Sequence, residues 1–354
     1  MADLTFAQHG GWPVVLGNLL DGVSLSREEA RLTMSEILDG AASPAQIAAF
    51  IVALRMKGET VDELVGMVDA MLAASTRVVI DTTGPVVDIV GTGGDRAHTI
   101  NVSTLSALVV AGAGGKVCKH GNRAASSACG AADLLEALGV AVDIGPEAVA
   151  RCVTEAGMGF CFAPRYHPAM RHAGPSRRDL GIPTAFNILG PLSNPGRVQR
   201  YLIGVADERM ATRMAGVLQA NGAVRALIVH GGDGLDELTT TGPSSVVELN
   251  DGEISSWSVD PTDFGLARAD REDLVGGDAQ INAELARRVL AGEPGPHRDI
   301  VILNAGAGLV AAGLEPGLGG GIAAAARSID SGAAVKALHD LVAVSQREAG
   351  ESPG

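Results

Sequence analysis

The segment DIVGTGGDRAHTINVST, residues 88–104, decides how the rest of the sequence is interpreted. It starts in an apolar run of β-formers, passes through the turn GTGGD at 91–95, and leads into the apolar helix pattern LSALVVAGA. A strand, a glycine turn and a hydroxyl-rich helix start together present backbone N–H groups to an anion. We therefore predict a phosphate-binding loop, with a plain glycine turn between a strand and a helix as the alternative.

The glycine turn matches neither of the two commonest phosphate motifs. Arg96 stands where the dinucleotide fingerprint requires a glycine, and no GxxxxGK[ST] pattern occurs in the chain. The phosphate loop is therefore expected to be of another kind.

The chain has 354 residues, enough for a large α/β domain and a smaller one. Aromatic residues make up only 3% of it, so the core is expected to consist of Ala, Val, Leu and Ile. No apolar run approaches the roughly 20 residues that span a bilayer, and the N-terminus has no signal pattern. The four cysteines lack metal-site spacing. These features predict a cytoplasmic protein with reduced thiols and no membrane partner.

The net charge of −14 argues against a polyanion such as nucleic acid as the partner. Basic residues are nevertheless clustered. Of only four lysines, Lys116 and Lys119 lie close to Arg123, and a second cluster spans RYHPAMRHAGPSRR at 165–178. This distribution suggests a small anionic ligand in one focused site, although solvated surface charge explains any one of these residues.

Residues 12–75 predict four short helices, three of them with capping boxes that begin at Ser26, Ser43 and Thr60. We expect a small all-helical domain over 1–76, with a returning helical segment near 168–185. It is too small to be a convincing stand-alone core, so we also expect it to bury a face against a partner subunit.

From residue 85 onward, strand-like runs alternate with helical stretches. The runs are VVDIV, KVCKH, GFCFA, YLIGVA, RALIVHG and SSVVEL. This alternation predicts an α/β domain over 77–354 with a mostly parallel sheet flanked by helices. Ligands bind at the carboxyl ends of strands in such sheets, so GTGGD, KHGNR and HGGDGLDE are expected to line one site. The region from Gln280 to Glu348 is predicted to be helical and to be interrupted by the glycines of 317–321.

Three further clusters can carry chemistry. Residues 119–127, KHGNRAASS, offer many charge-assisted bonds to phosphate, and we favour ligand binding over a surface loop. Asp236 and Glu237 are adjacent hard ligands that suit Mg²⁺, with a surface acidic turn as the alternative. Arg177 and Arg178 are expected to begin a short helix, where a guanidinium could bind a carboxylate.

Together these segments resemble the successive signatures of the anthranilate phosphoribosyltransferase family. The matching stretches, in the family's order, are GTGGD, NVST, KHGNRAASS, GAADLLEALG, FAPRYHPAM, SRRDLGIPTAFNILGPLSNP and DGLDELTTT. The resemblance implies a homodimer with a helical domain hinged to an α/β domain of the nucleoside phosphorylase and phosphoribosyltransferase type. It also implies transfer of the phosphoribosyl group of 5-phosphoribosyl diphosphate (PRPP) to the amine of anthranilate, with release of pyrophosphate, in tryptophan biosynthesis.

The resemblance also implies roles for individual residues. Anthranilate would be bound by Gly91, Asn122 and Arg177, and Mg²⁺ by Ser103, Asp236 and Glu237. PRPP would be bound by Gly91, Gly94, Asp95, Thr99, Asn101, Val102, Ser103, Thr104, Lys119, His120, Gly121, Asn122, Arg123, Ala124, Ala125, Ser126 and Ser127. The chain departs from the family pattern at Ala131, where a serine is usual, and in the glycine-rich NAGAG at 304–308, which we expect to lie far from the chemistry.

An arylamine is unprotonated at neutral pH, so no general base is assigned. The difficult step is the departure of pyrophosphate, and Lys119 with the glycine turn is expected to stabilise its charge. A pyrimidine nucleoside phosphorylase-like enzyme is the rival interpretation among enzymes. A non-catalytic relative that binds nucleic acid is the rival of another class.

Overall fold

The computed structural model describes residues 5–95, 97–124 and 128–350. These residues form a seven-stranded sheet in the order β3-β2-β1-β4-β5-β6-β7. The strands are β1 (Val86–Gly91), β2 (Lys116–Gly121), β3 (Met158–Phe162), β4 (Arg200–Gly204), β5 (Arg225–Gly231), β6 (Ser244–Asn250) and β7 (Glu253–Val259). The five strands from β3 to β5 in this order pair parallel, whereas β6 pairs antiparallel with β5 and β7 pairs antiparallel with β6. The predicted, mostly parallel sheet is confirmed, and each of the six predicted runs contains a strand.

Strand β7 was not predicted, because its sequence EISSWSV is polar and largely exposed. It continues from β6 through Asp251 and Gly252, whose φ angles of 47° and 87° build a tight hairpin turn. An Asp-Gly pair after a strand was therefore the overlooked signal.

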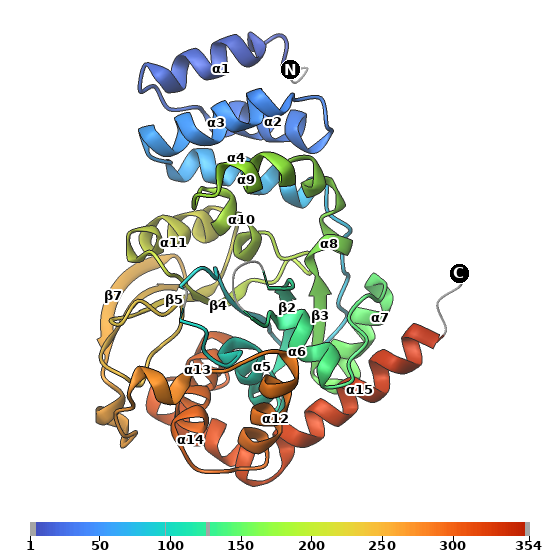
Figure 1. The fold of residues 1–354 in the computed structure, drawn as a ribbon, viewed down its shortest axis with the longest axis vertical. Coiled ribbons are helices and arrows are strands. Elements are labelled where there is room, and N and C mark those ends of the chain that lie inside the picture. The colour runs from blue at the N-terminus through green and yellow to red at the C-terminus, as the bar shows by residue number, and fades with distance from the viewer. Residues whose placement is uncertain (1–4, 96, 125–127, 351–354) are drawn as a thin grey trace.

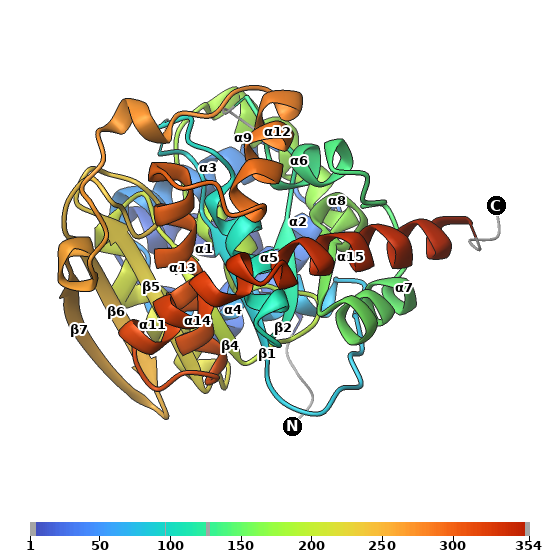
Figure 2. The same cartoon turned by 90° about the horizontal axis from the view of Figure 1, so that it is seen from below.

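Helices cover both faces of the sheet (Figures 1 and 2). On one face, α5 (Val102–Gly112) packs against α13 (Pro296–Ala312) and α15 (Ala333–Gly350). The same side carries α12 (Ala279–Leu290) and α14 (Leu318–Asp330). On the other, α11 (Ala211–Ala220) packs on β5 and β6, and α10 (Phe186–Leu192) on β2. Helix α5 is buried almost all round, which explains its uniformly apolar sequence. Helix α7 (Pro146–Arg151) packs beside the edge strand β3 and is continued by a π-helical turn to Ala156, while α6 (Ala131–Ala137) packs against α12.

The N-terminal helices stack above the sheet (Figure 1). They are α1 (Gly11–Leu20), α2 (Arg27–Leu38), α3 (Pro44–Lys57) and α4 (Val61–Ala73), and the three predicted capping boxes are all present. The last box is reinforced by a buried ion pair of 2.9 Å between Lys57 and Glu63. Glu63 also accepts from the backbone N–H of Leu25, which connects the start of α2 to α4.

The chain later returns to these helices through three short elements. They are α8 (Ala163–Tyr166), a 3₁₀ turn (Pro168–His172) and α9 (Gly174–Leu180). Helix α9 packs on α3, where the Ser176 hydroxyl donates to the carbonyl of Pro44 at 3.2 Å. The prediction that Arg177 begins a helix is wrong: Pro175 near the N-terminus starts α9 earlier, so Arg177 lies in its last turn.

In the part of the chain that the structure describes, no helix has both the length and the apolarity that crossing a membrane requires.

The predicted interruption of the C-terminal helices at 317–321 is confirmed only in part: α13 ends at Ala312 and Gly317 precedes the start of α14, but the glycines at 319–321 lie inside α14. A Cβ on Gly321 would come within 2.3 Å of the carbonyl oxygen of Gly306 in α13. The absence of a side chain at Gly321 therefore lets the two helix backbones approach closely, and packing outweighs the low helix propensity of glycine.

We predict that Gly321→Ala lowers the free energy of unfolding by about 1–3 kcal/mol, because the new methyl group meets backbone that cannot move aside. Gly319→Ala in the same helix is the matched control, since its Cβ would only touch the Phe264 ring at 3.8 Å. Urea unfolding should show this control to be neutral or slightly stabilising. Equal stability of the two variants would contradict the close-packing argument.

Candidate functional site

A cavity of about 360 Å³ opens at the carboxyl ends of β1 and β2. From β1 the chain adds β2 and β3 on one side of the sheet and then continues with β4 on the other side of β1. Ligands in open α/β sheets bind at such a change in strand order, here between β1 and β4. The lining includes the glycine turn, the start of α5, the β2–α6 connection and the acidic loop after β5. The residues predicted for PRPP and Mg²⁺ that line it are Gly91, Gly94, Asp95, Thr99, Asn101, Val102, Ser103, Thr104, Lys119, His120, Gly121, Asn122, Arg123, Ala124, Asp236 and Glu237. Ala125, Ser126 and Ser127 lie outside the described residues.

The glycine turn is built around the carboxylate of Asp236. Gly93 and Gly94 have φ angles of 70° and 87°, which favour glycine. The backbone N–H of Gly93 donates to Asp236 Oδ2 at 2.6 Å. A Cβ at Gly91 would lie 2.4 Å from the same oxygen, and one at Gly204 in β4 would lie 1.6 Å from the Asp236 carbonyl. The glycines at 91 and 204 therefore make room for the acidic loop.

Asp236 and Glu237 are a buried acidic pair, and the charge of Lys119 acts against the rise in the pKa of Glu237. Glu237 accepts from the backbone N–H of Ser103 at 3.0 Å. Burial, reinforced by repulsion from Asp95, raises the pKa of Asp236 to about 7. Burial and the charge of Asp236 raise the pKa of Glu237 well above its usual value.

The donor set fits a hard divalent cation. Two adjacent carboxylates whose ionised forms are disfavoured by burial would be stabilised by a positive ion beside them. Among residues 5–95, 97–124 and 128–350, no group of three or more His, Cys, Asp or Glu forms a metal site. A cation here would thus need ligand or water oxygens as well, which is the usual manner of Mg²⁺.

Lys119 is almost completely buried in β2, with its ammonium group next to the start of α5. Nζ donates to the carbonyl of Ile89 and lies 3.1 Å from the hydroxyl of Ser103. Burial lowers the pKa of Lys119, while the charges of Asp88, Glu237 and Asp236 act in the opposite direction. The lysine is therefore fixed in place, and its ammonium group interacts electrostatically with the nearby carboxylates.

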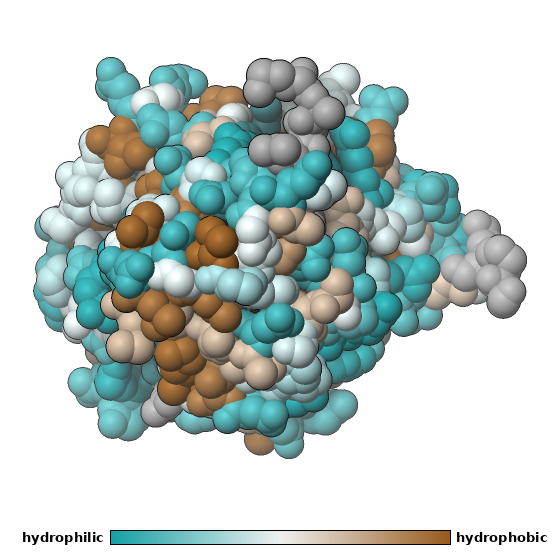
Figure 3. Space-filling model, turned by 90° about the horizontal axis from the view of Figure 1, so that it is seen from above, coloured by the Kyte–Doolittle hydropathy of each residue, from teal (hydrophilic) through white to brown (hydrophobic). Residues whose placement is uncertain are grey.

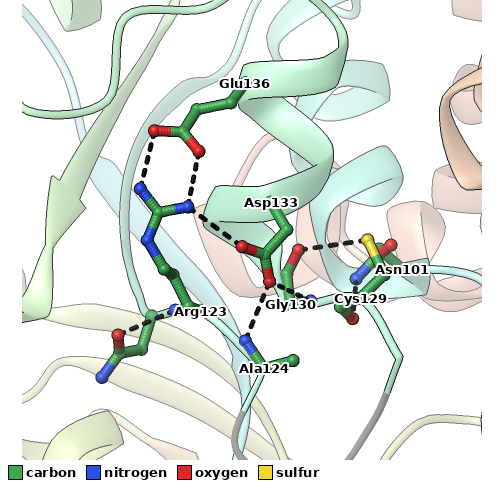
Figure 4. A network of polar contacts seen from close by, with 8 residues as sticks. Asn101, Arg123, Ala124, Cys129, Gly130, Asp133 and Glu136 are labelled. Carbon is green, nitrogen blue, oxygen red and sulfur yellow. Dashed lines mark hydrogen bonds and ion pairs between the residues drawn. The ribbon is translucent and has the colours of Figure 1, made fainter. Parts of the chain in front are cut away.

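The β2–α6 connection is held at its base by Asp133 of α6 (Figure 4). Asp133 Oδ2 accepts from the backbone N–H groups of Ala124 at 3.0 Å and Gly130 at 2.9 Å. Although Arg123 lines the cavity, its guanidinium bonds Asp133 at 3.0 Å and Glu136 at 2.5 and 2.8 Å. In this structure the charge of Arg123 is thus directed to α6.

The residues predicted for anthranilate are only partly brought together. Gly91 and Asn122 line the cavity, whereas Arg177 lies outside the lining that the described residues form. Its guanidinium stacks 5.6 Å from the centre of the Phe186 ring, and burial lowers its pKa. The residue after Phe186, Asn187, does line the cavity. Sequence reasoning missed Asn187 because an amide at the start of a short helix in a proline-rich stretch carries no distinctive signal.

His120 lines the cavity and is neutral. Burial lowers the pKa of His120 to about 3 and that of His167, 5.0 Å away between ring centres, to about 4. Each ring pairs with a backbone carbonyl at 3.0 Å, His120 with Gly190 and His167 with Ser193. Both imidazoles are therefore uncharged near neutral pH.

Several other lining residues were missed or undervalued. His98, Ile100, Cys129 and Gly130 face the cavity, and so does Ala131 at the position where a serine was expected. The expectation that residues 304–308 lie far from the chemistry is wrong. Asn304 is buried and accepts from the N–H of Leu238 at 2.9 Å while donating to its carbonyl at 2.8 Å. Because Leu238 follows Glu237 directly, helix α13 anchors the acidic loop.

Comparison with known protein families divides the chain into two matched parts. Residues 83–335 match the model of the "Glycosyl transferase family, a/b domain", and residues 13–75 match that of the "Glycosyl transferase family, helical bundle domain".

Curated relatives and solved structures agree with this match. Anthranilate phosphoribosyltransferase of Rhodococcus jostii (strain RHA1) is 54% identical, covering 92% of this chain and 91% of its own. That of Arthrobacter sp. (strain FB24) is 51% identical, covering 98% and 100%. The crystal structure of the Thermus thermophilus enzyme has a TM-score of 0.89 at 44% identity, covering 94% of this chain and 99% of that one. The Saccharomyces cerevisiae enzyme in complex with PRPP and Mg has a TM-score of 0.86 at 28% identity, covering 95% and 98%.

Identity of this extent over nearly the whole length, on the same fold, shows that the chain belongs to the anthranilate phosphoribosyltransferase family.

Proposed function

We propose that this protein transfers the phosphoribosyl group of PRPP to the amine of anthranilate, giving N-(5-phosphoribosyl)anthranilate and pyrophosphate in tryptophan biosynthesis. The observation that carries the proposal is the cavity in which the glycine turn, Lys119 and the acids Asp236 and Glu237 converge. Such a cavity suits a sugar diphosphate accompanied by a cation, and the relatives at 51–55% identity bear this activity in their names.

The chain's own groups account for the difficult part of the reaction. As the bond from the ribose to pyrophosphate breaks, negative charge grows on the leaving group. The ammonium of Lys119 is held by Ile89 and Ser103 before substrate arrives, so it would stabilise that charge without reorganising. The N–H groups of Thr92 and Gly93 are already engaged by Gly204 and Asp236, so the glycine turn would contribute through its other N–H groups. The arylamine of anthranilate is already unprotonated, so the protein only has to position it for attack on the ribose.

Magnesium would be held by Asp236, Glu237 and the hydroxyl of Ser103. When bound, it would neutralise part of the diphosphate charge. The buried acidic pair, whose pKa values are raised by burial, supports this assignment, and the yeast relative was solved with PRPP and Mg.

Anthranilate would meet Gly91 and Asn122 at the cavity, with Arg177 binding its carboxylate. Arg177 sits on α9, which packs on α3 of the N-terminal helices, and this supports a site between the helical part and the sheet. We propose residues 1–76 with the returning segment 168–185 as one domain and 77–354 as the other. A yeast relative was solved with 4-fluoroanthranilate.

The alternatives have less support. A nucleoside phosphorylase would leave the acidic pair and Arg177 without a clear role. A nucleic-acid-binding relative needs an extended basic face, which a net charge of −14 does not favour.

We also propose a homodimer formed through the N-terminal helices. Apolar side chains gather on the end of the molecule that carries α1 (Figure 3). Four apolar side chains of the N-terminal helical part are exposed: Val14 (42%) and Leu20 (78%) of α1, Val23 (52%) in the connection after α1, and Met56 (85%) of α3. A cluster of exposed apolar residues is typical of an interaction surface.

The direct test of the activity is the loss of anthranilate fluorescence in the presence of PRPP and Mg²⁺. We expect turnover that stops with excess EDTA and returns when Mg²⁺ is added back, because the acidic pair then regains its cation. Undiminished turnover in EDTA would contradict the magnesium site. Turnover of a pyrimidine nucleoside with phosphate, but not of PRPP with anthranilate, would contradict the proposed function.

Arg177→Ala should raise the KM for anthranilate about 10- to 100-fold and leave the KM for PRPP nearly unchanged, because a charged hydrogen bond to the carboxylate is lost. Arg178→Ala is the matched control, since Arg178 is exposed on the same helix. Steady-state kinetics should find both of its KM values within about twofold of wild type. Equal increases in the two KM values of Arg177→Ala would rule out a role specific to anthranilate.

The double variant Leu20→Glu/Met56→Glu should sediment as a monomer, because burying two carboxylates in the interface is costly. Ile254→Glu on β7, where the side chain is 37% exposed, is the control and should sediment like wild type at twice the chain mass. A double variant that stays dimeric in sedimentation velocity would place the interface elsewhere.

A further inference from the structure

Residues 98–101, which precede α5 and line the cavity, are held by a segment from far along the chain. The N–H of Ile100 donates to the carbonyl of Leu274 at 3.1 Å, and the N–H of Gly276 donates to the carbonyl of His98 at 2.9 Å. These two hydrogen bonds flank Thr99 and Val275, which lie opposite each other as a single antiparallel β-bridge. The segment 274–276 therefore acts as a brace for one wall of the cavity.

Asn282, in the first turn of α12, continues this brace through its side chain. It is 2% exposed and lies outside the cavity lining formed by the described residues. Its Oδ1 accepts from the N–H of Gly277 at 2.7 Å, and its Nδ2 donates to Asn101 Oδ1 at 2.9 Å. Asn101 Nδ2 in turn donates to the carbonyl of Cys129 at 3.0 Å.

The relay of hydrogen bonds from Gly277 through Asn282 and Asn101 to Cys129 has a fixed order of donors and acceptors. A backbone N–H at Gly277 can only donate, so it faces the oxygen of Asn282. The amino end of Asn282 must then face Asn101, which turns the oxygen of Asn101 toward it. A backbone carbonyl at Cys129 can only accept, and it takes one amide proton of Asn101. Both ends of the relay thus enforce the same orientation of the two side-chain amides.

The orientation decides what Asn101 offers a ligand. Its oxygen is engaged by Asn282 and one amide proton by Cys129, so the second amide proton remains for the cavity. With the amide reversed, Asn101 would present an oxygen instead. Phosphate and pyrophosphate oxygens accept hydrogen bonds, so only the observed orientation is attractive to PRPP.

We propose that Asn282 is a positioning residue for PRPP: it fixes the amide of Asn101 so that an N–H faces the cavity, and it does so without touching the substrate. Through Asn101 and Cys129 it also holds the far end of the β2–α6 connection to the start of α5. The inference rests on the proposed function, because it takes PRPP as the ligand of the cavity.

The two substitutions Asn282→Asp and Asn282→Ala separate orientation from packing. Aspartate is nearly isosteric and keeps the acceptor for Gly277, but it places an acceptor against Asn101 and so favours the reversed amide. Alanine removes more contacts but leaves the carbonyl of Cys129 to hold the observed orientation of Asn101. If orientation matters, aspartate is the more harmful change for PRPP, although alanine is the more harmful one for packing.

The experiment is steady-state kinetics of both variants and wild type at pH 8.5, together with their melting temperatures. We expect Asn282→Asp to raise the KM for PRPP on the order of tenfold or more, and Asn282→Ala to raise it by less, about threefold. The KM for anthranilate should stay within about twofold in both, and the melting temperatures verify that both variants are folded under the assay conditions.

A KM for PRPP that rises more in Asn282→Ala than in Asn282→Asp would overturn the proposal, because it would follow the loss of packing. Equal rises in the two substrates' KM values, or no rise in Asn282→Asp, would overturn it as well. Wild-type turnover of PRPP and anthranilate is measured in the same series. Its absence would instead refute the proposed function, so the two failures are distinguishable.

Discussion

The hydrogen bond from the Gly93 backbone to the carboxylate of Asp236 is the interaction on which the site depends. It joins the turn after β1 to the loop after β5, two segments separated by more than a hundred residues. The contact is possible because Gly91 and Gly204 carry no Cβ where the acidic loop passes. A second bond, from Ser103 to Glu237, fastens the same loop to the start of α5. The glycine turn and the acidic pair are therefore one structural unit.

Electrostatics explain why this unit suits a charged substrate with a cation. Burial works against the charged forms of Lys119, Asp236 and Glu237 alike, and a single ammonium faces several carboxylates. A divalent cation relieves the repulsion between the acids, and a diphosphate then complements both the cation and the lysine. The protein thus holds its polar groups in an arrangement that PRPP and Mg²⁺ would complete, which is the physical meaning of preorganisation.

The walls of the cavity are supported by residues that never face it. Asn304 of α13 hydrogen-bonds the N–H and the carbonyl of Leu238, the residue after Glu237, and Asn282 of α12 orients Asn101. Asp133 of α6 gathers the base of the β2–α6 connection, as Figure 4 shows. Each of these is a short polar side chain that binds backbone or another amide, so it transmits position with little freedom. The C-terminal helices therefore contribute to the site although their sequences show no catalytic pattern.

The sequence by itself determined the local features: capped N-terminal helices, the six core strands, and turns rich in groups that bind phosphate or magnesium. These depend on neighbouring residues, so patterns such as Ser26-x-x-Glu29 or GTGGD are sufficient to predict them. Only the tertiary structure decided that Arg123 is directed to Asp133 and Glu136, that Arg177 stacks on Phe186, and that Asn282 and Asn304 support the cavity. These contacts join residues that are distant in the chain or whose side chains have several possible partners. Which partner each one meets follows from how the segments pack, and no local pattern encodes that.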